Sequence, residues 1–573
     1  MTTVAAQPGR PPDAHPQRQR GFVGGLLSSR TTRLDLGLLA ALSVFVFAIQ
    51  SLAWPLFPGR DAQTYLMYYL DMWSSDPVFP QLMLFRTPLA PLFNGFFLDA
   101  GGSLAAEAAL GVLYVLAILA TYCAGSFWSR RIGLAAALAL LAYPGYGALY
   151  HNVSSDALFA FGVIAWTVLI LDTAAEPSRI KFALHGVALF VLVLIRPSGL
   201  FFLPLFAVFP LLLAGSLRHR LTNAAVFAAT GVVLVMGFAA YNQVRYEDFT
   251  VSRMGPAHYP LYRLLAIDRL IAPENGPASR ELAQAIESDL LPREPYRSYG
   301  VDLQEFLTTG RIRMFSDLAG LSDRVWGWDD NYGRLRAASL EAIRAHPLGY
   351  AKGVSRTAKE SMLATYFPPV PSSPPPTRTI LCELGCFGEG FVTIAGRRLP
   401  SPSERGEPIP TGHAYWLAST PDNRITTDWT TISRPSFRFE RPGDAARFER
   451  LSSDLRELMS QLPSRDGSHF VAASLRSISD LYPSMWIWLL VGAVGLAFRP
   501  QRNLRVLVFL CFLGLALVGL NALGEPPAPE YRMPADPLFV LFGIIGLVGS
   551  AVVRPPQDEQ IRWARLRGLR SRR

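Results

Sequence analysis

The sequence predicts an α-helical polytopic membrane protein with about ten transmembrane helices and a large extracytoplasmic mixed domain inserted before the last three helices. Two observations predict this class. Hydrophobic residues make up 50% of the 573 residues and charged residues only 17%, which is too apolar for an ordinary soluble protein. The apolar residues also gather in uncharged windows long enough to cross roughly 30 Å of hydrocarbon.

Eight of these windows each predict one span. A longer apolar stretch, over 182–217, predicts two spans because Arg196-Pro197-Ser198-Gly199 interrupts it. The eight windows cover 36–59, 108–129, 132–155, 157–171, 221–244, 481–498, 506–524 and 537–553.

Basic residues occupy every second junction between spans, and Lys and Arg near span ends resist translocation. This alternation predicts cytoplasmic termini and a large domain on the outer face of the cell membrane. The net charge of +10 then serves topology and attraction to lipid headgroups, and needs no nucleic acid to explain it. The basic residues are Arg10, Arg18, Arg20, Arg30, Arg33, Arg130, Arg131, Arg179, Lys181, Arg218, Arg220, Arg499, Arg502 and Arg505, followed by the arginines of 554–573.

The predicted organisation follows from these spans. The first 33 residues are too long and too hydrophilic for a cleaved signal peptide, so the first span is expected to stay as an anchor. Helical spacing of apolar residues predicts amphipathic helices over 278–291, 335–345 and 443–462, whereas the fold of 367–440 is not assigned. The predicted parts are a polar cytoplasmic tail 1–33, a transmembrane module 34–245 with a first outer loop 58–104, an extracytoplasmic domain 246–480, C-terminal transmembrane helices 481–553 and a basic cytoplasmic tail 554–573.

The four cysteines do not indicate a catalytic or metal-binding role. Cys123 and Cys511 lie inside apolar spans and are expected to pack there. Cys382 and Cys386 lie in the outer domain, where a disulfide and two free thiols both stay open. A Walker loop, a dinucleotide fingerprint, H-E-x-x-H and G-x-S-x-G are all missing from the sequence, so nucleotide hydrolysis and zinc or serine hydrolase chemistry lose support.

Charged residues gather at the predicted outer ends of the spans, and the spans themselves are nearly clean of them. Transporters usually place ionisable groups in mid-span. Charges at one surface instead suit an enzyme or receptor whose ligand has a lipid tail in the bilayer and a polar head at the interface. The outer positions are Asp61, Arg86, Asp156, Arg196, Glu530 and Arg532.

The order and sidedness of these charged motifs resemble the landmarks of the GT-C glycosyltransferases. Within that superfamily the likeness is to the bacterial branch similar to protein mannosyltransferases and aminoarabinose transferases. It covers roughly 36–246 and 481–553, and in the outer domain only 334–350. The motifs are Asp61 after the first span, Arg86-Thr87-Pro88-Leu89, Ser155-Asp156-Ala157-Leu158, Arg196-Pro197-Ser198-Gly199-Leu200 and Glu530-Tyr531-Arg532-Met533-Pro534.

The resemblance implies inverting transfer of a sugar from a polyprenyl phosphate donor to a glycan, lipid or protein acceptor on the outer face. Asp61 matches the family's catalytic aspartate, the general base, and Asp156 a second acidic position. Arg86, Arg196 and Arg532, with Tyr531, match positions near the donor phosphate, although the family more often has Lys where Arg86 stands. Some relatives use a divalent cation and others do not, so a metal stays open and has no assigned ligands.

Each of these residues also has a structural interpretation. Asp61 could cap a helix or form a structural ion pair, and Asp156 could cap the helix that starts at Ala157. The arginines could anchor span ends at the interface. His151 is a candidate partner for a carboxylate or metal, or an interfacial residue at a span end. Trp326, Trp328 and Asp329 could bind sugar or pack a core.

Two other functions compete with the transferase. In a non-catalytic exporter or flippase component for lipid-linked sugars, the same charges would only recognise the headgroup. A ligase moving whole glycans would share the sidedness but place its arginines mostly in one large outer loop.

Overall fold

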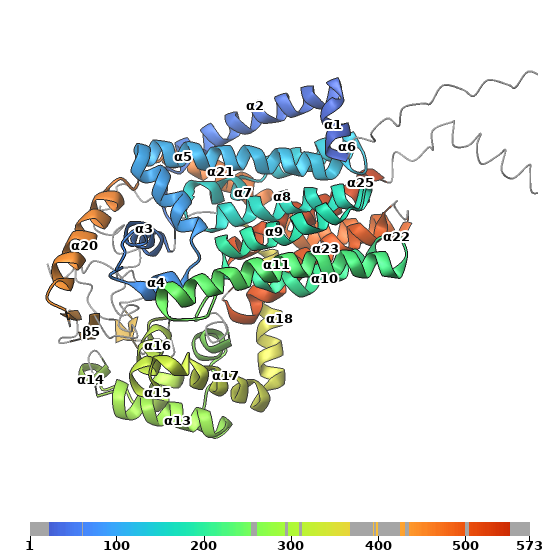
Figure 1. The fold of residues 1–573 in the computed structure, drawn as a ribbon. Helices are drawn as coiled ribbons and strands as arrows, with labels where there is room; N and C mark the ends of the chain where they lie inside the picture. The colour runs from blue at the N-terminus through green and yellow to red at the C-terminus, as the bar shows by residue number, and fades with distance from the viewer. Residues whose placement is uncertain are drawn as a thin grey trace, which may run out of the picture.

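The computed structural model describes a bundle of long apolar helices with a helical layer at one end (Figure 1). α1 (Phe22–Ser28) lies at one end of the bundle, and α3 (Ala62–Asp71) and α4 (Pro80–Phe85) lie at the other, which we call the outer end. The described residues are 22–59, 61–253, 260–292, 296–308, 312–366, 393–394, 397–398, 425–429, 435–439, 441–463, 465–498, 503–525 and 527–549.

Each predicted apolar window overlaps at least one helix. The predicted interruption at Arg196 is confirmed: one helix ends at Ile195, a 3₁₀ turn covers Pro197–Phe201, and the next helix begins at Phe202. The bundle consists of α2 Arg30–Ala53, α5 Leu89–Ser126, α6 Arg130–Leu141, α7 Pro144–Ala148, α8 Asp156–Ala175, α9 Arg179–Ile195, α10 Phe202–Leu212, α11 Leu217–Tyr246, α22 Met485–Phe498, α23 Leu504–Gly524 and α25 Asp536–Gly549.

The described residues contain seven helices long and apolar enough to cross a membrane, or eight if α6 and α7, bent by 70°, form one broken span. The predicted count of about ten is therefore not reached by this criterion. The difference lies in α9 and α10, which have 17 and 11 residues, fewer than the roughly 20 of a full span. The protein is an α-helical, multi-pass membrane protein.

Serine starts several of these helices. A serine at the N-cap accepts a hydrogen bond from a backbone N–H of the first turn, where no helical partner exists. Such serines precede the first helical residue of α2, α6, α9, α11 and α21 (His469–Leu481). They are Ser29, Ser129, Ser178, Ser216 and Ser468.

α5 is two helices joined at a break. Gly102 has φ +66°, a left-handed conformation that favours glycine. The break separates a first half, 89–100, from the long second half that packs against α2, α6 and α8. The first half therefore stays beside α3 at the outer end (Figure 1).

The helical layer at the outer end has its own core, built by apolar residues between Leu261 and Ala342. The predicted amphipathic helices are present as α13 (Pro277–Ala285) with the π-helix that follows it, α17 (Gly333–Ala345) and α20 (Asp444–Ser460). Pro347 follows α17 and opens α18 (Pro347–Leu363), which runs from this layer back to the bundle (Figure 1).

The two ends of the predicted outer domain pack differently. Leu455 and Leu458 of α20 belong to the same apolar core as the membrane helices, whereas α13, α16 (Ile312–Trp326) and α17 share the separate core. Between them the described residues form two short antiparallel pairs, β3 (Thr393–Ile394) with β4 (Arg397–Arg398) and β5 (Ile425–Trp429) with β6 (Pro435–Phe439). Cys382 and Cys386, and most of 367–440, lie outside the described residues.

Candidate functional site

Two outer loops meet through a short parallel strand pair. β1 (Phe57–Pro58) pairs with β2 (Asn152–Val153), and the Gly59 N–H donates to the Val153 carbonyl oxygen at 3.2 Å. A Cβ on Gly59 would lie 2.8 Å from that oxygen, so the approach requires glycine. The segments that carry Asp61 and Asp156 are thereby held side by side.

Asp61 forms an ion pair with Arg86. Arg86 directly follows α4, and its Nη2 lies 3.0 Å from Asp61 Oδ2. In the described chain Asp61 holds the N-cap position of α3 without a capping hydrogen bond, so the structure favours the ion pair over the helix cap. Both side chains are about one-third exposed, 32% for Asp61 and 31% for Arg86, which leaves them open to a ligand.

Asp156 forms the second ion pair, with Arg196. Arg196 Nη1 lies 2.6 Å from Asp156 Oδ1, at the point where α8 begins and α9 ends. The local turn is closed by Ser154, whose hydroxyl accepts the Asp156 N–H at 3.2 Å. The Asp156 carboxylate is therefore turned toward Arg196 rather than used for capping.

Tyr65 connects the two ion pairs and is not among the site residues predicted from the sequence. Its hydroxyl donates to Ser155 Oγ at 3.0 Å, and the Arg86 guanidinium lies 5.9 Å from its ring centroid. Burial, and then the charge of Asp61, raise the pKa of the phenol. The signal that could have found it is its spacing, four residues after Asp61 and so on the same face of α3.

Tyr531 joins the cluster from the C-terminal part of the chain. The Arg196 guanidinium lies 5.2 Å from the Tyr531 ring centroid and 6.0 Å from that of Phe159. Asn521 fixes the Tyr531 backbone, because its side-chain amide donates to the Tyr531 carbonyl oxygen at 2.7 Å. Cation–π contact thus places an aromatic ring beside the second ion pair.

Arg532, predicted to act with Arg86 and Arg196, has other partners. Its Nε and Nη2 donate to the Asp536 carboxylate at 2.7 and 3.0 Å, and Nη2 also donates to the Tyr143 hydroxyl. Its Nη1 donates to the carbonyl oxygens of Ser361 and Ala364 at the end of α18. All five N–H groups of this buried guanidinium are engaged, so its geometry is that of a structural clamp.

His151 is fully buried and contacts Phe47 and Glu107. Its ring stacks on Phe47 with centroids 4.3 Å apart, and its Nδ1 lies 4.0 Å from Glu107 Oε1. Arg465 binds both oxygens of that carboxylate at 2.7 and 2.8 Å. These contacts join α2, α5 and the segment before α21.

Both tryptophans of the outer layer pack against other side chains. Trp328 lies under the Arg253 guanidinium, 3.4 Å from its ring centroid, and beside residues of α3 and α4. Trp326 packs against the separate outer core, and Asp329 is exposed. The packing interpretation therefore fits Trp326 and Trp328, and Arg253 supports the site indirectly because its N–H donates to Leu84 of α4 at 2.8 Å.

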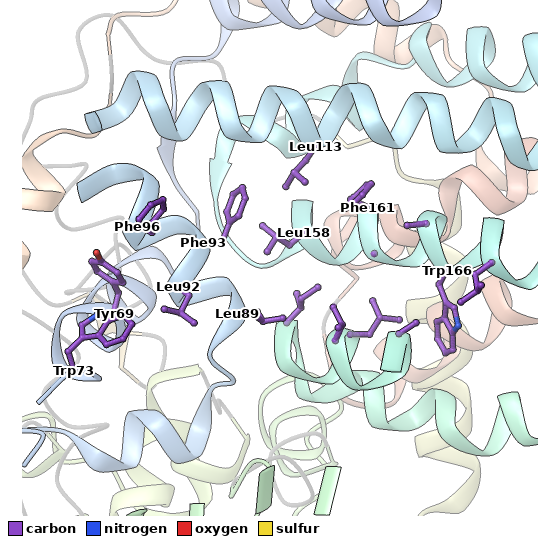
Figure 2. A pocket seen from close by; sticks show the side chains of 17 residues that line it. Tyr69, Trp73, Leu89, Leu92, Phe93, Phe96, Leu113, Leu158, Phe161 and Trp166 are labelled. Carbon is purple, nitrogen blue, oxygen red and sulfur yellow. The ribbon is translucent and has the colours of Figure 1, made fainter. Parts of the chain in front are cut away.

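An apolar cavity of about 680 Å³ adjoins the charged cluster. Figure 2 shows Tyr69 and Trp73 at one end and Trp166 at the other. Three lining residues are neighbours in sequence of the ion pairs: Leu89, Leu158 and Ile195 lie three, two and one residues from Arg86, Asp156 and Arg196. The cavity is lined by Tyr69, Trp73, Leu89, Leu92, Phe93, Phe96, Leu113, Leu158, Phe161, Gly162, Ala165, Trp166, Leu169, Ala188, Val191, Leu192 and Ile195.

A metal centre is not formed by the part of the chain that the structure describes, where no three His, Cys, Asp or Glu side chains come together. Each carboxylate of the cluster instead has a guanidinium partner. The site combines two partly open ion pairs, two phenols and an adjoining apolar cavity at the outer end of a membrane bundle.

Two solved structures resemble this fold. The first is ArnT from Cupriavidus metallidurans bound to undecaprenyl phosphate, with 13% identity over 83% of this chain and 82% of that one, and a TM-score of 0.35. The second is the Archaeoglobus fulgidus oligosaccharyltransferase tethered to an acceptor peptide, with 12% identity over 93% of this chain and 53% of that one, and a TM-score of 0.37. No family model and no curated protein matches the sequence.

Both structures belong to the GT-C glycosyltransferases, the superfamily that the sequence motifs resemble. The chain spans about half the length of the oligosaccharyltransferase. At TM-scores below 0.5, neither likeness establishes the activity of this chain, which is argued below from its own residues.

Proposed function

We propose that this protein is an inverting membrane glycosyltransferase that moves a sugar from a polyprenyl phosphate donor to an acceptor on the extracytoplasmic face. One observation carries the proposal. Two partly exposed carboxylate–guanidinium pairs, Asp61–Arg86 and Asp156–Arg196, lie beside a deep apolar cavity in the bundle. A phosphate head on a hydrocarbon chain matches both halves of this site.

The guanidinium groups are suited to the departing phosphate. Arginine binds phosphate through two parallel N–H donors, and the charge on the phosphate increases as its bond to the sugar breaks. Arg86 and Arg196 approach from different helices, with Tyr65 and Tyr531 beside them. Arg532 is assigned the clamp described above instead of a phosphate contact.

Asp61 is suited to the proton transfer. In the reaction, the acceptor oxygen bonds to the anomeric carbon, the bond from that carbon to the phosphate oxygen breaks, and the acceptor proton passes to the Asp61 carboxylate. Arg86 is paired with that carboxylate before the donor binds. A phosphate arriving at Arg86 competes for the same guanidinium and so frees Asp61 to act as a base.

The test uses the purified full-length protein in lipid vesicles with a panel of radiolabelled polyprenyl phosphate sugars. Transfer predicts release of free polyprenyl phosphate together with a labelled acceptor. Movement of the intact lipid-linked sugar between leaflets, without cleavage, would instead support the exporter or flippase. If no member of the panel is cleaved or bound, the assignment of the donor class fails.

A further inference from the structure

The apolar cavity runs from Tyr69 and Trp73 to Trp166, and its inner part lies between α8 and α9 (Figure 2). Leu158 comes two residues after Asp156, and Trp166 is two turns further along α8, about 12 Å away at 1.5 Å per residue. This distance is less than half of the roughly 30 Å hydrocarbon core. The cavity can therefore hold only the part of a long lipid chain that is nearest its phosphate.

Hydrogen bonds hold Trp166 in place at the inner end of the cavity. Trp166 is 3% exposed, and its indole N–H donates to His185 Nδ1 at 2.9 Å. The other ring nitrogen of His185 lies 3.0 Å from the Thr173 hydroxyl. A fully bonded polar chain inside an apolar bundle fixes its members, because breaking any bond leaves a polar group unsatisfied in hydrocarbon.

The cavity is open on one side, where the rest of the lipid chain could leave it. Val191 of α9 lines the cavity and is 40% exposed, so the cavity opens to the outside of the bundle along α9. A chain that meets Trp166 would turn outward past Val191. The fixed indole thus limits how much of the chain the protein contacts.

We propose that Trp166, held in place by His185, is a specificity-determining residue: it sets the depth to which the hydrocarbon chain of the lipid phosphate enters between α8 and α9. This inference rests on the proposed function for the identity of the lipid. The occupant is the proximal segment of a polyprenyl phosphate, because Leu89, Leu158 and Ile195 line the cavity within three residues of Arg86, Asp156 and Arg196. Chain length beyond the indole then contributes little to binding.

The experiment measures dissociation constants of geranyl, farnesyl and undecaprenyl phosphate for the full-length protein in detergent, by displacement of a fluorescent polyprenyl phosphate. Trp166→Ala should weaken the chains that reach the indole by about tenfold through lost apolar contact, and leave geranyl phosphate nearly unchanged. Ala165→Phe, which fills the cavity above the indole, should move the loss to shorter chains.

Two further variants test the hydrogen bond and serve as controls. His185→Leu should reproduce part of the loss of binding seen in Trp166→Ala. His185→Gln, which keeps an acceptor for the indole N–H, should bind the three phosphates like the wild-type protein. Trp486, exposed on α22 away from the cavity lining, provides the matched control, and Trp486→Ala should leave all three constants unchanged.

Equal weakening of all three phosphates by Trp166→Ala, or no weakening of any, would overturn the inference. Because the assay measures binding, it also separates the two proposals. A length-dependent loss of binding without sugar transfer by the wild-type protein would refute the transferase and leave the Trp166 assignment standing. Sugar transfer by the wild-type protein without a length-dependent loss of binding in Trp166→Ala would support the transferase and refute the Trp166 assignment.

Discussion

The open cluster and the sealed clamp use the same chemical groups for different purposes. In the cluster, Asp61 and Arg86 form an ion pair and are about one-third exposed. In the clamp, Arg532 and Asp536 are at most 1% exposed, and every guanidinium N–H is bonded. A guanidinium that can bind a ligand must keep donors available, whereas one that joins helices uses them all.

The largest expected effect is the loss of catalysis in Asp61→Asn. Removing a general base lowers transfer by about 100-fold to 10,000-fold, while the partly exposed side chain contributes little to folding. Steady-state transfer and donor binding should be measured together, and donor affinity should stay the same or rise, because the neutral amide no longer competes with the phosphate for Arg86. Full transfer by this variant would remove Asp61 from the chemistry.

Substitutions in the clamp of Arg532 and Asp536 should lower the stability of the protein. Arg532→Ala leaves the Asp536 carboxylate buried without its partner, which costs about 3–5 kcal/mol of unfolding free energy. The double variant Arg532→Met with Asp536→Leu should recover most of that loss, since it removes both charges. Thermal unfolding in detergent measures this, and a stable Arg532→Ala protein with weakened donor binding would instead place Arg532 in the phosphate site.

Arg196→Ala should weaken donor binding with a smaller effect on folding. The loss of charged hydrogen bonds to phosphate corresponds to about 1.5–3 kcal/mol, or roughly 10-fold to 100-fold in affinity. Arg196→Lys should restore only part of it, because lysine lacks the two-donor geometry. Unchanged affinity for a polyprenyl phosphate in Arg196→Ala would limit the site to Arg86.

Tyr65→Phe should have a modest effect on turnover. It removes the hydrogen bond to Ser155 that ties α3 to the start of α8, worth about 0.5–1.5 kcal/mol. If Tyr65 positions the two ion pairs, kcat falls several-fold while the KM for the donor stays constant. A rise in KM alone would assign the phenol to donor binding.

Glu341 provides a reference carboxylate that serves structure alone. Burial raises its pKa, but hydrogen bonds from the Ala278 and Ser279 N–H groups and the Ser279 hydroxyl lower it more, so its pKa lies below the ordinary value. Its contribution to stability is therefore present above the unfolded-state pKa and is lost as the pH falls through the folded-state pKa. Hydrogen exchange of α13 should show this acid-dependent loss, and Glu341→Gln should abolish it.

Much of the fold followed from the sequence because hydrophobic windows are local signals. The interruption at Arg196 and the amphipathic helices were predicted from the same local patterns. The short α9 and α10 were not, since apolar length alone does not fix where a helix ends. The break in α5 also depends on a backbone conformation at Gly102 that composition does not reveal.

The site was only partly predictable for a related reason. Asp61, Arg86, Asp156, Arg196 and Tyr531 share a side of the bundle, and the structure brings them together. From the sequence, Arg532 looked equivalent to Arg86 and Arg196. Its contacts with Ser361 and Ala364, about 170 positions away in the chain, depend on the fold and cannot be read from a local pattern. The apolar cavity is a gap between packed helices, and no residue pattern predicts such a gap.

The most direct test is a structure of the full-length protein with undecaprenyl phosphate. We expect density for the phosphate between Arg86 and Arg196, near Asp61, with the first part of the chain running past Leu158 toward Trp166. Phosphate density at Arg532, or a chain lying outside the cavity between α8 and α9, would show that the proposed donor site is wrong.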